Sequence, residues 1–142
     1  MKTLLTALLV IWLLAGCQAG PQVGEDAATA EEASLSYCPE LMWEVYQYDS
    51  AFDRLVVTDD PQEFDAVRLA ALRIAALSDI TIHRMPASVA LENHWLSYLQ
   101  QSALGFHTAT SPMNDYVAAI QAYNALSHGI IRAKSACEKA AL

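Results

Sequence analysis

Positively charged residues are scarce in this chain, which has eight Lys and Arg against sixteen Asp and Glu. A surface with such an excess of negative charge repels phosphate groups, including those of nucleic acids and of anionic lipid head groups. We therefore expect no nucleic-acid partner and only weak electrostatic binding to a membrane.

Long apolar runs are also scarce. The run from Leu4 to Leu14 has no charged residue, but it is shorter than the roughly 20 residues that a spanning helix needs. It follows Lys2 and precedes two small residues and Cys17, which is the pattern of a secretory leader. The alternatives are an ordinary leader with an incidental cysteine and an uncleaved anchor helix.

The four residues Leu14-Ala15-Gly16-Cys17 resemble the lipobox of bacterial lipoproteins at every position. The resemblance covers only the first seventeen residues. It implies a diacylglyceryl group on the Cys17 thiol, cleavage after Gly16 and acylation of the new N-terminus, for example by palmitate. Several acyl chains anchor a protein far more firmly than one. The next residue is Gln18 and not aspartate, so the resemblance favours the periplasmic face of the outer membrane over the inner membrane.

Composition divides the rest of the chain in two. We expect a signal peptide over 1–16, a lipid anchor and flexible acidic tether over 17–34, and a helical domain over 35–142. The tether has almost no large apolar residue and is unable to bury enough surface to order itself. Removing Lys2 with the leader leaves seven basic residues, so the mature chain has a net charge near minus nine.

Only two cysteines, Cys38 and Cys137, remain once Cys17 is acylated. They lie near opposite ends of the predicted domain and would be exported to an oxidising compartment, where disulfides persist. We expect a disulfide between them; the alternative is a pair of buried free thiols.

Apolar residues recur at steps of three and four through four segments, as in amphipathic helices. The core face of the second segment is predicted to comprise Phe64, Val67, Leu69, Ala71, Leu72, Ile74, Ala76, Leu77 and Ile80. That of the fourth is predicted to comprise Tyr116, Ala119, Ile120, Tyr123, Leu126, Ser127, Ile130, Ala133, Lys134 and Cys137. The first helix is predicted to open at Cys38-Pro39 and to end near Val57. The second is predicted over 61–84, with Asp60 as N-cap and Glu63 completing a capping box. The third is predicted over 87–104 with Gly105 as its C-cap, and the fourth from Ser111-Pro112 onwards.

Short links between four helices predict an all-α fold, an up-down-up-down antiparallel four-helix bundle in which the disulfide joins the first and last helices. The disulfide then sets the register between those two helices. It predicts five levels of contact: Leu41 with Ala133 or Lys134, Val45 with Ile130, Tyr48 with Leu126 or Ser127, Phe52 with Tyr123, and Leu55 with Ile120.

Four residues are candidates for binding a partner. Met42, Trp43 and Tyr46 lie beside the apolar stripe of the first helix and not on it, and Trp95 is expected in the same half of the bundle. If these side chains face solvent, they form a groove for a partner helix, with aromatic anchors and an adaptable methionine. The alternative is that they complete the core.

Metal, haem and catalytic sites find little support in the sequence. The four histidines contain no i, i+4 pair, and a haem held by Met42 and His128 would require ligands that the predicted register places at different levels. Six acidic residues form an acidic corner, namely Asp49, Asp53, Asp59, Asp60, Glu63 and Asp65. Helix capping and solvation explain this corner more readily than calcium binding does. No nucleophile lies beside a base in a known catalytic motif. We expect no enzymatic activity, no cofactor and no metal.

The sequence thus predicts a lipid-anchored envelope protein that acts as a non-catalytic binding or assembly module for another envelope protein. This layout is similar to that of the small helical pilotins of type II secretion, which are lipidated, disulfide-linked and bind a secretin tail. The likeness rests on no shared motif and transfers no residues. A helical carrier of haem or metal and a purely structural spacer are the alternatives.

Overall fold

The computed structural model describes residues 30–112 and 115–141. Cys17, the predicted signal peptide and most of the predicted tether lie outside the described residues. Within the described ranges the chain forms five helices and no strand, which confirms the predicted all-α class. The helices are α2 (Ala30–Thr58), α3 (Pro61–Arg84), α4 (Ala87–Glu92), α5 (His94–Ala109) and α6 (Tyr116–Ala140). In this part of the chain, no helix has the length and apolar character to cross a membrane.

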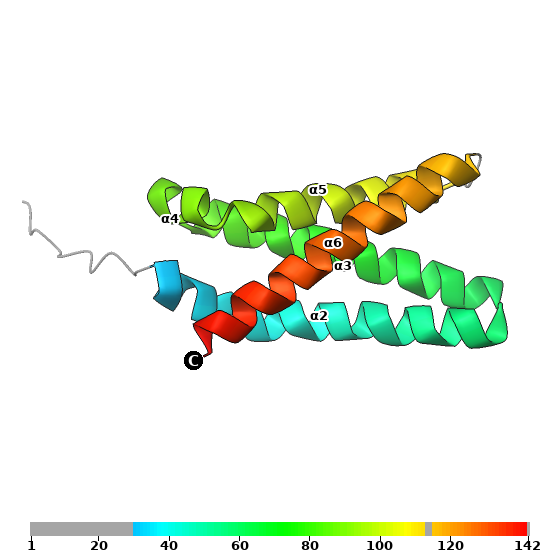
Figure 1. The fold of residues 1–142 in the computed structure, drawn as a ribbon, viewed down its shortest axis with the longest axis horizontal. Coiled ribbons are helices and arrows are strands. Elements are labelled where there is room, and N and C mark those ends of the chain that lie inside the picture. The colour runs from blue at the N-terminus through cyan, green and yellow to red at the C-terminus, as the bar shows by residue number, and fades with distance from the viewer. Residues whose placement is uncertain (1–29, 113–114, 142) are drawn as a thin grey trace, which may run out of the picture.

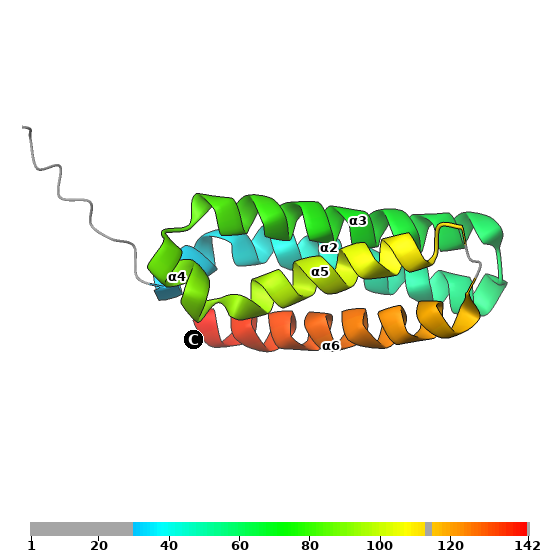
Figure 2. The ribbon, with the colours of Figure 1, turned by 90° about the horizontal axis from the view of Figure 1, so that it is seen from above.

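The four long helices lie side by side as a helical bundle (Figures 1 and 2). α3 packs between α2 and α5, and α6 packs mainly on α5 and more sparsely on α2. The α2–α3 and α5–α6 connections lie at one end of the molecule, whereas α4 and the C-terminal end of α6 lie at the other (Figure 2). We call the latter the disulfide end and the former the distal end.

The core is a column of aliphatic side chains to which every long helix contributes. Its largest fully buried members include Leu41 of α2, Ile74 of α3, Leu96 and Leu99 of α5, and Leu126 of α6. Burying side chains of this size stabilises a fold by about 1.5 to 3 kcal/mol each, so this column accounts for the association of the helices.

α2 begins eight residues before the predicted start at Cys38, and Pro39 lies inside it. A proline in a helix lacks the N–H that would bond to the carbonyl four residues earlier. Tyr37 and Cys38 are nevertheless buried, and the Tyr37 ring lies 6.3 Å from that of Trp95. We infer that this packing keeps the chain helical ahead of the proline, so the helix includes residues assigned to the end of the tether.

α3 has the predicted bounds and the predicted N-cap. The Asp60 carboxylate accepts a hydrogen bond from the backbone N–H of Gln62 at 2.9 Å, and Pro61 begins the helix. The predicted capping box is wrong in one detail. The Glu63 carboxylate binds Arg54 of α2 at 2.9 Å instead of turning back to the Asp60 N–H. That N–H donates a hydrogen bond to the Thr58 hydroxyl.

The predicted third helix is broken at Asn93 into α4 and α5. The buried Asn93 side chain donates to the Val89 carbonyl and accepts from the Trp95 indole N–H at 3.2 Å. Gly105 is not a C-cap, because α5 continues past it to Ala109. His107, expected in a loop, is therefore on the helix.

α6 begins at Tyr116, later than the predicted start at Ser111-Pro112. The N-cap is Asp115, whose carboxylate accepts from the Ala118 backbone N–H at 3.0 Å. The predicted core face of α6 is confirmed only in part. Tyr116 and Ile120 are exposed, while Ala119, Leu126, Ile130, Ala133 and Cys137 are buried.

Candidate functional site

The disulfide between Cys38 and Cys137 joins α2 and α6, with the two Cα atoms 5.6 Å apart. Both cysteines are buried. A shallow crevice of about 390 Å³ lies beside them, and Met42, Lys134 and Glu138 contribute to its walls. The predicted pairing of these cysteines is confirmed.

Trp43 and Tyr46 lie together on the surface of α2. Their rings stack with centroids 6.0 Å apart and an interplanar angle of 29°, and each residue is about 60% exposed. Two large aromatic residues that stack on each other while facing solvent leave apolar area that a partner would cover.

A groove runs between α2 and α3 beside this pair and has a volume of about 580 Å³. Trp43 and Glu44 line it from α2, together with Pro39 and Glu40 one turn earlier in the same helix. Its other wall belongs to α3 and consists of Arg73, Ala76, Leu77 and Ile80. We call this surface the aromatic groove.

The aromatic groove combines apolar side chains with charged ones, among them Glu44. One carboxylate oxygen of Glu44, Oε2, is buried and has no hydrogen-bond partner among the described residues. A buried acceptor without a partner is costly, by about 1 to 3 kcal/mol or more for a charged group. A donor brought by a ligand would relieve that cost.

The structure separates the four residues that the sequence grouped as one partner-binding site. Trp43 and Tyr46 lie together, but Met42 is half-buried and lines the crevice between α2 and α6. Trp95 is buried, with its ring 6.3 Å from Tyr37 and its N–H bonded to Asn93. Trp95 therefore completes the core, which was the alternative interpretation, and does not line the aromatic groove.

The sequence did not identify the α3 wall of the groove. Leu77 and Ile80 were both assigned to the inward faces of that helix, yet Ile80 is 45% exposed. Ile80 follows Asp79, whose carboxylate accepts from the Gln100 amide at 2.7 Å. The breadth of the apolar arc on this helix was the available signal, because an arc wider than one partner helix covers leaves part of itself at the surface.

The two residues considered as haem ligands lie in different surroundings. Met42 lines the crevice beside the disulfide, and His128 is exposed and is not among the residues lining it. His83 and His107 each place Nδ1 near a backbone carbonyl, that of Asp79 and that of Arg68. The described residues contain no group of three or more His, Cys, Asp or Glu side chains placed to hold a metal ion.

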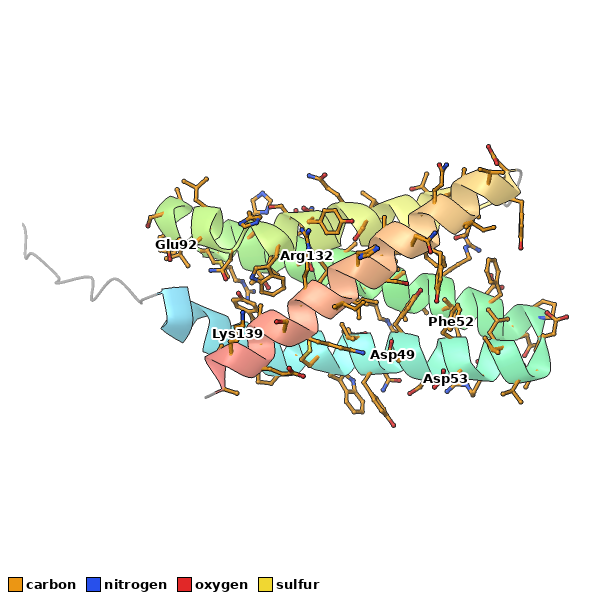
Figure 3. All side chains as sticks on the ribbon, viewed as in Figure 1. Asp49, Phe52, Asp53, Glu92, Arg132 and Lys139 are labelled. Carbon is orange, nitrogen blue, oxygen red and sulfur yellow. A yellow bond between two sulfur atoms is a disulfide. The ribbon has the colours of Figure 1, made fainter. Side chains whose placement is uncertain are left out.

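The acidic corner is spread over separate local interactions. Asp60 caps α3, Glu63 pairs with Arg54, and Asp65 pairs with Arg68 at 3.1 Å. Asp49 of α2 (Figure 3) accepts from the Lys134 ammonium of α6 at 2.6 Å. These carboxylates act as caps and ion-pair partners at different places on the bundle.

Comparison with family models, with curated proteins and with solved structures finds no match to this chain. The functional assignment therefore rests on the sequence pattern and on the geometry described above.

Proposed function

We propose that this protein is a lipid-anchored lipoprotein of the bacterial outer membrane whose helical domain binds a helical segment of another envelope protein. The domain is an up-down-up-down four-helix bundle in which α4 and α5 together form the third leg. It has no catalytic role in this proposal. The aromatic groove holds the partner, and the lipid on Cys17 holds the domain at the membrane.

The observation that carries the proposal is the solvent-facing Trp43–Tyr46 stack beside an apolar groove. Tryptophan and tyrosine are the side chains most enriched among residues that dominate binding energy at interfaces. A groove between two helices, with Ala76, Leu77 and Ile80 along one wall, suits the apolar face of an amphipathic helix.

The charges of the groove favour a partner helix that carries basic residues. Glu40 and Glu44 line the groove against the single base Arg73. The unpartnered Glu44 Oε2 atom needs a donor, and the mature chain as a whole is acidic. A lysine or arginine of the partner would bond to Glu44 and lie against the Trp43 ring, where a cation is attracted by the aromatic face.

The disulfide supports the proposed location in the cell envelope. Structural disulfides persist in oxidising compartments such as the bacterial periplasm, and the Cys38–Cys137 bridge fits a chain that has been exported. Metabolic labelling with palmitate tests the anchor directly. Cys17→Ser is expected to abolish acylation and cleavage at the lipobox, so labelled palmitate is no longer incorporated. Undiminished palmitate incorporation would contradict lipidation at Cys17.

Co-purification tests the groove. We expect the native chain, cross-linked in cells and purified under stringent conditions, to retain a discrete envelope protein that the Trp43→Ala/Tyr46→Ala variant loses. Leu91→Ala/Ile131→Ala is the matched control, because both residues are large, apolar and exposed away from the groove. Equal retention by all three proteins would contradict binding through the aromatic groove.

A further inference from the structure

A second and larger cavity opens at the distal end of the bundle, away from the disulfide and the aromatic groove. Its volume is about 630 Å³, within the range of small-molecule sites. Every long helix contributes to it: Phe52 comes from α2, Phe64 from α3, Phe106 from α5 and Tyr123 from α6. We call this cavity the distal pocket.

The floor and walls of the distal pocket are mainly apolar. Val67 and Phe106 are buried at the floor, and the stacked Phe52 and Tyr123 rings, 5.1 Å apart, form part of the wall. Tyr116, which is 72% exposed, and Ile120 also line it. Both were predicted to be inward and are exposed, and in the structure they lie beside this open cavity.

The charges that line the distal pocket have one sign. Asp59 and Asp60 contribute to it, and no Lys, Arg or His is among the described residues that line it. Asp60 Oδ1 caps α3, and Asp59 is exposed. Arg54, near the C-terminal end of α2, is paired with Glu63. An anionic head group at this mouth would therefore meet two carboxylates without a compensating base.

We propose that the distal pocket binds a single-chain amphiphile with a positively charged head. The apolar chain occupies the space among the Phe52, Phe64 and Phe106 rings, and the head lies between the Asp59 and Asp60 carboxylates. Tyr116 and Tyr123 present aromatic faces that also attract a cation. This site shares no lining residue with the aromatic groove, so a failure of one proposal does not affect the other.

Photolabelling of the full chain in phosphatidylcholine vesicles tests the site. The probes are decyltrimethylammonium and decanoate, each with a diazirine at the same position of the chain. We expect the cationic probe to label peptides containing Phe52, Phe64 or Tyr123 up to about fivefold more than the carboxylate probe, since an exposed ion pair contributes up to about 1 kcal/mol. Unlabelled decyltrimethylammonium should suppress that labelling.

Two sets of variants sharpen the result. Ala119→Phe fills the pocket from α6 and should reduce labelling at least about tenfold. Asp59→Asn/Asp60→Asn should remove the preference for the cation, because asparagine preserves the N-cap and tolerates the positive φ of 51° at Asp59. Glu40→Gln/Glu138→Gln removes the same charge at the disulfide end and should leave the preference intact.

Equal labelling by the two probes would overturn the assignment of a cationic ligand. Labelling scattered over the surface, or insensitive to the unlabelled competitor in the native chain, would overturn the site itself. The competition arm needs no variant, so a folding failure of Ala119→Phe leaves the test decisive.

Discussion

The ring of Phe52 stacks on the ring of Tyr123, with centroids 5.1 Å apart and planes 16° from parallel. Phe52 lies fourteen residues after Cys38, and Tyr123 lies fourteen residues before Cys137. The stacked pair and the disulfide therefore mark two levels of one antiparallel register between α2 and α6, as the sequence predicted. Between these levels Asp49 and Lys134 add an ion pair.

The Phe52–Tyr123 pair should be energetically coupled. Phe52→Leu and Tyr123→Leu each remove one ring, and the double variant removes both. We expect a coupling of about 0.5 to 1.5 kcal/mol in the free energy of unfolding, as for other aromatic pairs. Urea denaturation of the four proteins measures it, and additive effects would contradict a stabilising contact at this level.

Removing the disulfide should cost more than any single contact between α2 and α6. Cys38 and Cys137 are 99 residues apart in sequence, and closing such a loop stabilises a fold by about 4 to 5 kcal/mol in the chain-entropy model. We expect the Cys38→Ala/Cys137→Ala variant to lose much of this in urea denaturation. A loss below about 1 kcal/mol would mean that the packing of α6 on α5 determines its position without the bridge.

The two glycines of the described helices should respond oppositely to a larger side chain. A Cβ at Gly129 of α6 would lie 2.8 Å from the Ser102 Oγ atom and 3.2 Å from a Leu99 methyl of α5, so Gly129→Leu should destabilise the fold by about 1 to 3 kcal/mol. A Cβ at Gly105 meets nothing within 4 Å.

Gly105→Ala is the matched comparison. Alanine is better than glycine inside a helix by about 1 kcal/mol, so this variant should raise the melting temperature. Thermal unfolding followed by circular dichroism measures both changes. A stabilising Gly129→Leu would contradict the close approach of α5 and α6.

Tyr48 carries a hydroxyl group that is buried and has no hydrogen-bond partner among the described residues. Burial raises the pKa of this hydroxyl well above its usual range, with smaller contributions from Tyr123 and Asp49. The folded state thus retains the proton to higher pH than the unfolded state. Tyr48 accordingly makes the free energy of unfolding fall as pH rises above about 10, and has no such effect at neutral pH.

Tyr48→Phe should therefore be neutral or stabilising at pH 7 and should reduce the loss of stability in alkali. Removing an unpaired buried hydroxyl relieves a desolvation cost of about 1 to 3 kcal/mol. Tyr98→Phe, at an exposed ring beside Arg132, is the control for loss of a tyrosine hydroxyl. A marked destabilisation by Tyr48→Phe at pH 7 would show that the hydroxyl has a partner in solution.

Local signals in the sequence predicted the parts of the fold that local physics determines. The Asp60 side chain caps the first turn of α3, and Pro61 has the backbone angle of a first helical residue. Both effects are local, so α3 was predicted with its observed bounds. The stripe from Cys38 to Tyr48 is narrow and regular, and all its members are buried. The pairing of Cys38 with Cys137 followed from their number and from the oxidising compartment to which a leader would export them.

Contacts between distant segments determined what the sequence did not reveal. Tyr37 is buried against Trp95, and this contact extends α2 ahead of Pro39. Asn93 interrupts the third segment where its side chain binds Val89 and Trp95. When the apolar arc of a helix is broader than its contact with a neighbour, the sequence does not show which part of the arc is buried. Ile80 and Ile120 were therefore predicted to be inward, and both are exposed.

The sequence predicted the part of the candidate site that lies on one helix and not the part that depends on contacts between helices. Position beside the α2 stripe was enough to single out Trp43 and Tyr46, which do lie together at the surface. Assigning Trp95 to the same surface needed the rotation of α5 about its axis, which periodicity alone does not specify.

Site-specific photocross-linking in living cells tests the proposed function most directly. A photoreactive amino acid replaces Ile80, in the aromatic groove, or Ile131, which is exposed on α6. We predict a discrete adduct from position 80 that is absent from position 131 and disappears with Trp43→Ala. Its labelled peptide should belong to a basic amphipathic helix of another envelope protein. No adduct from position 80, or the same adducts from both positions, would contradict the proposed function.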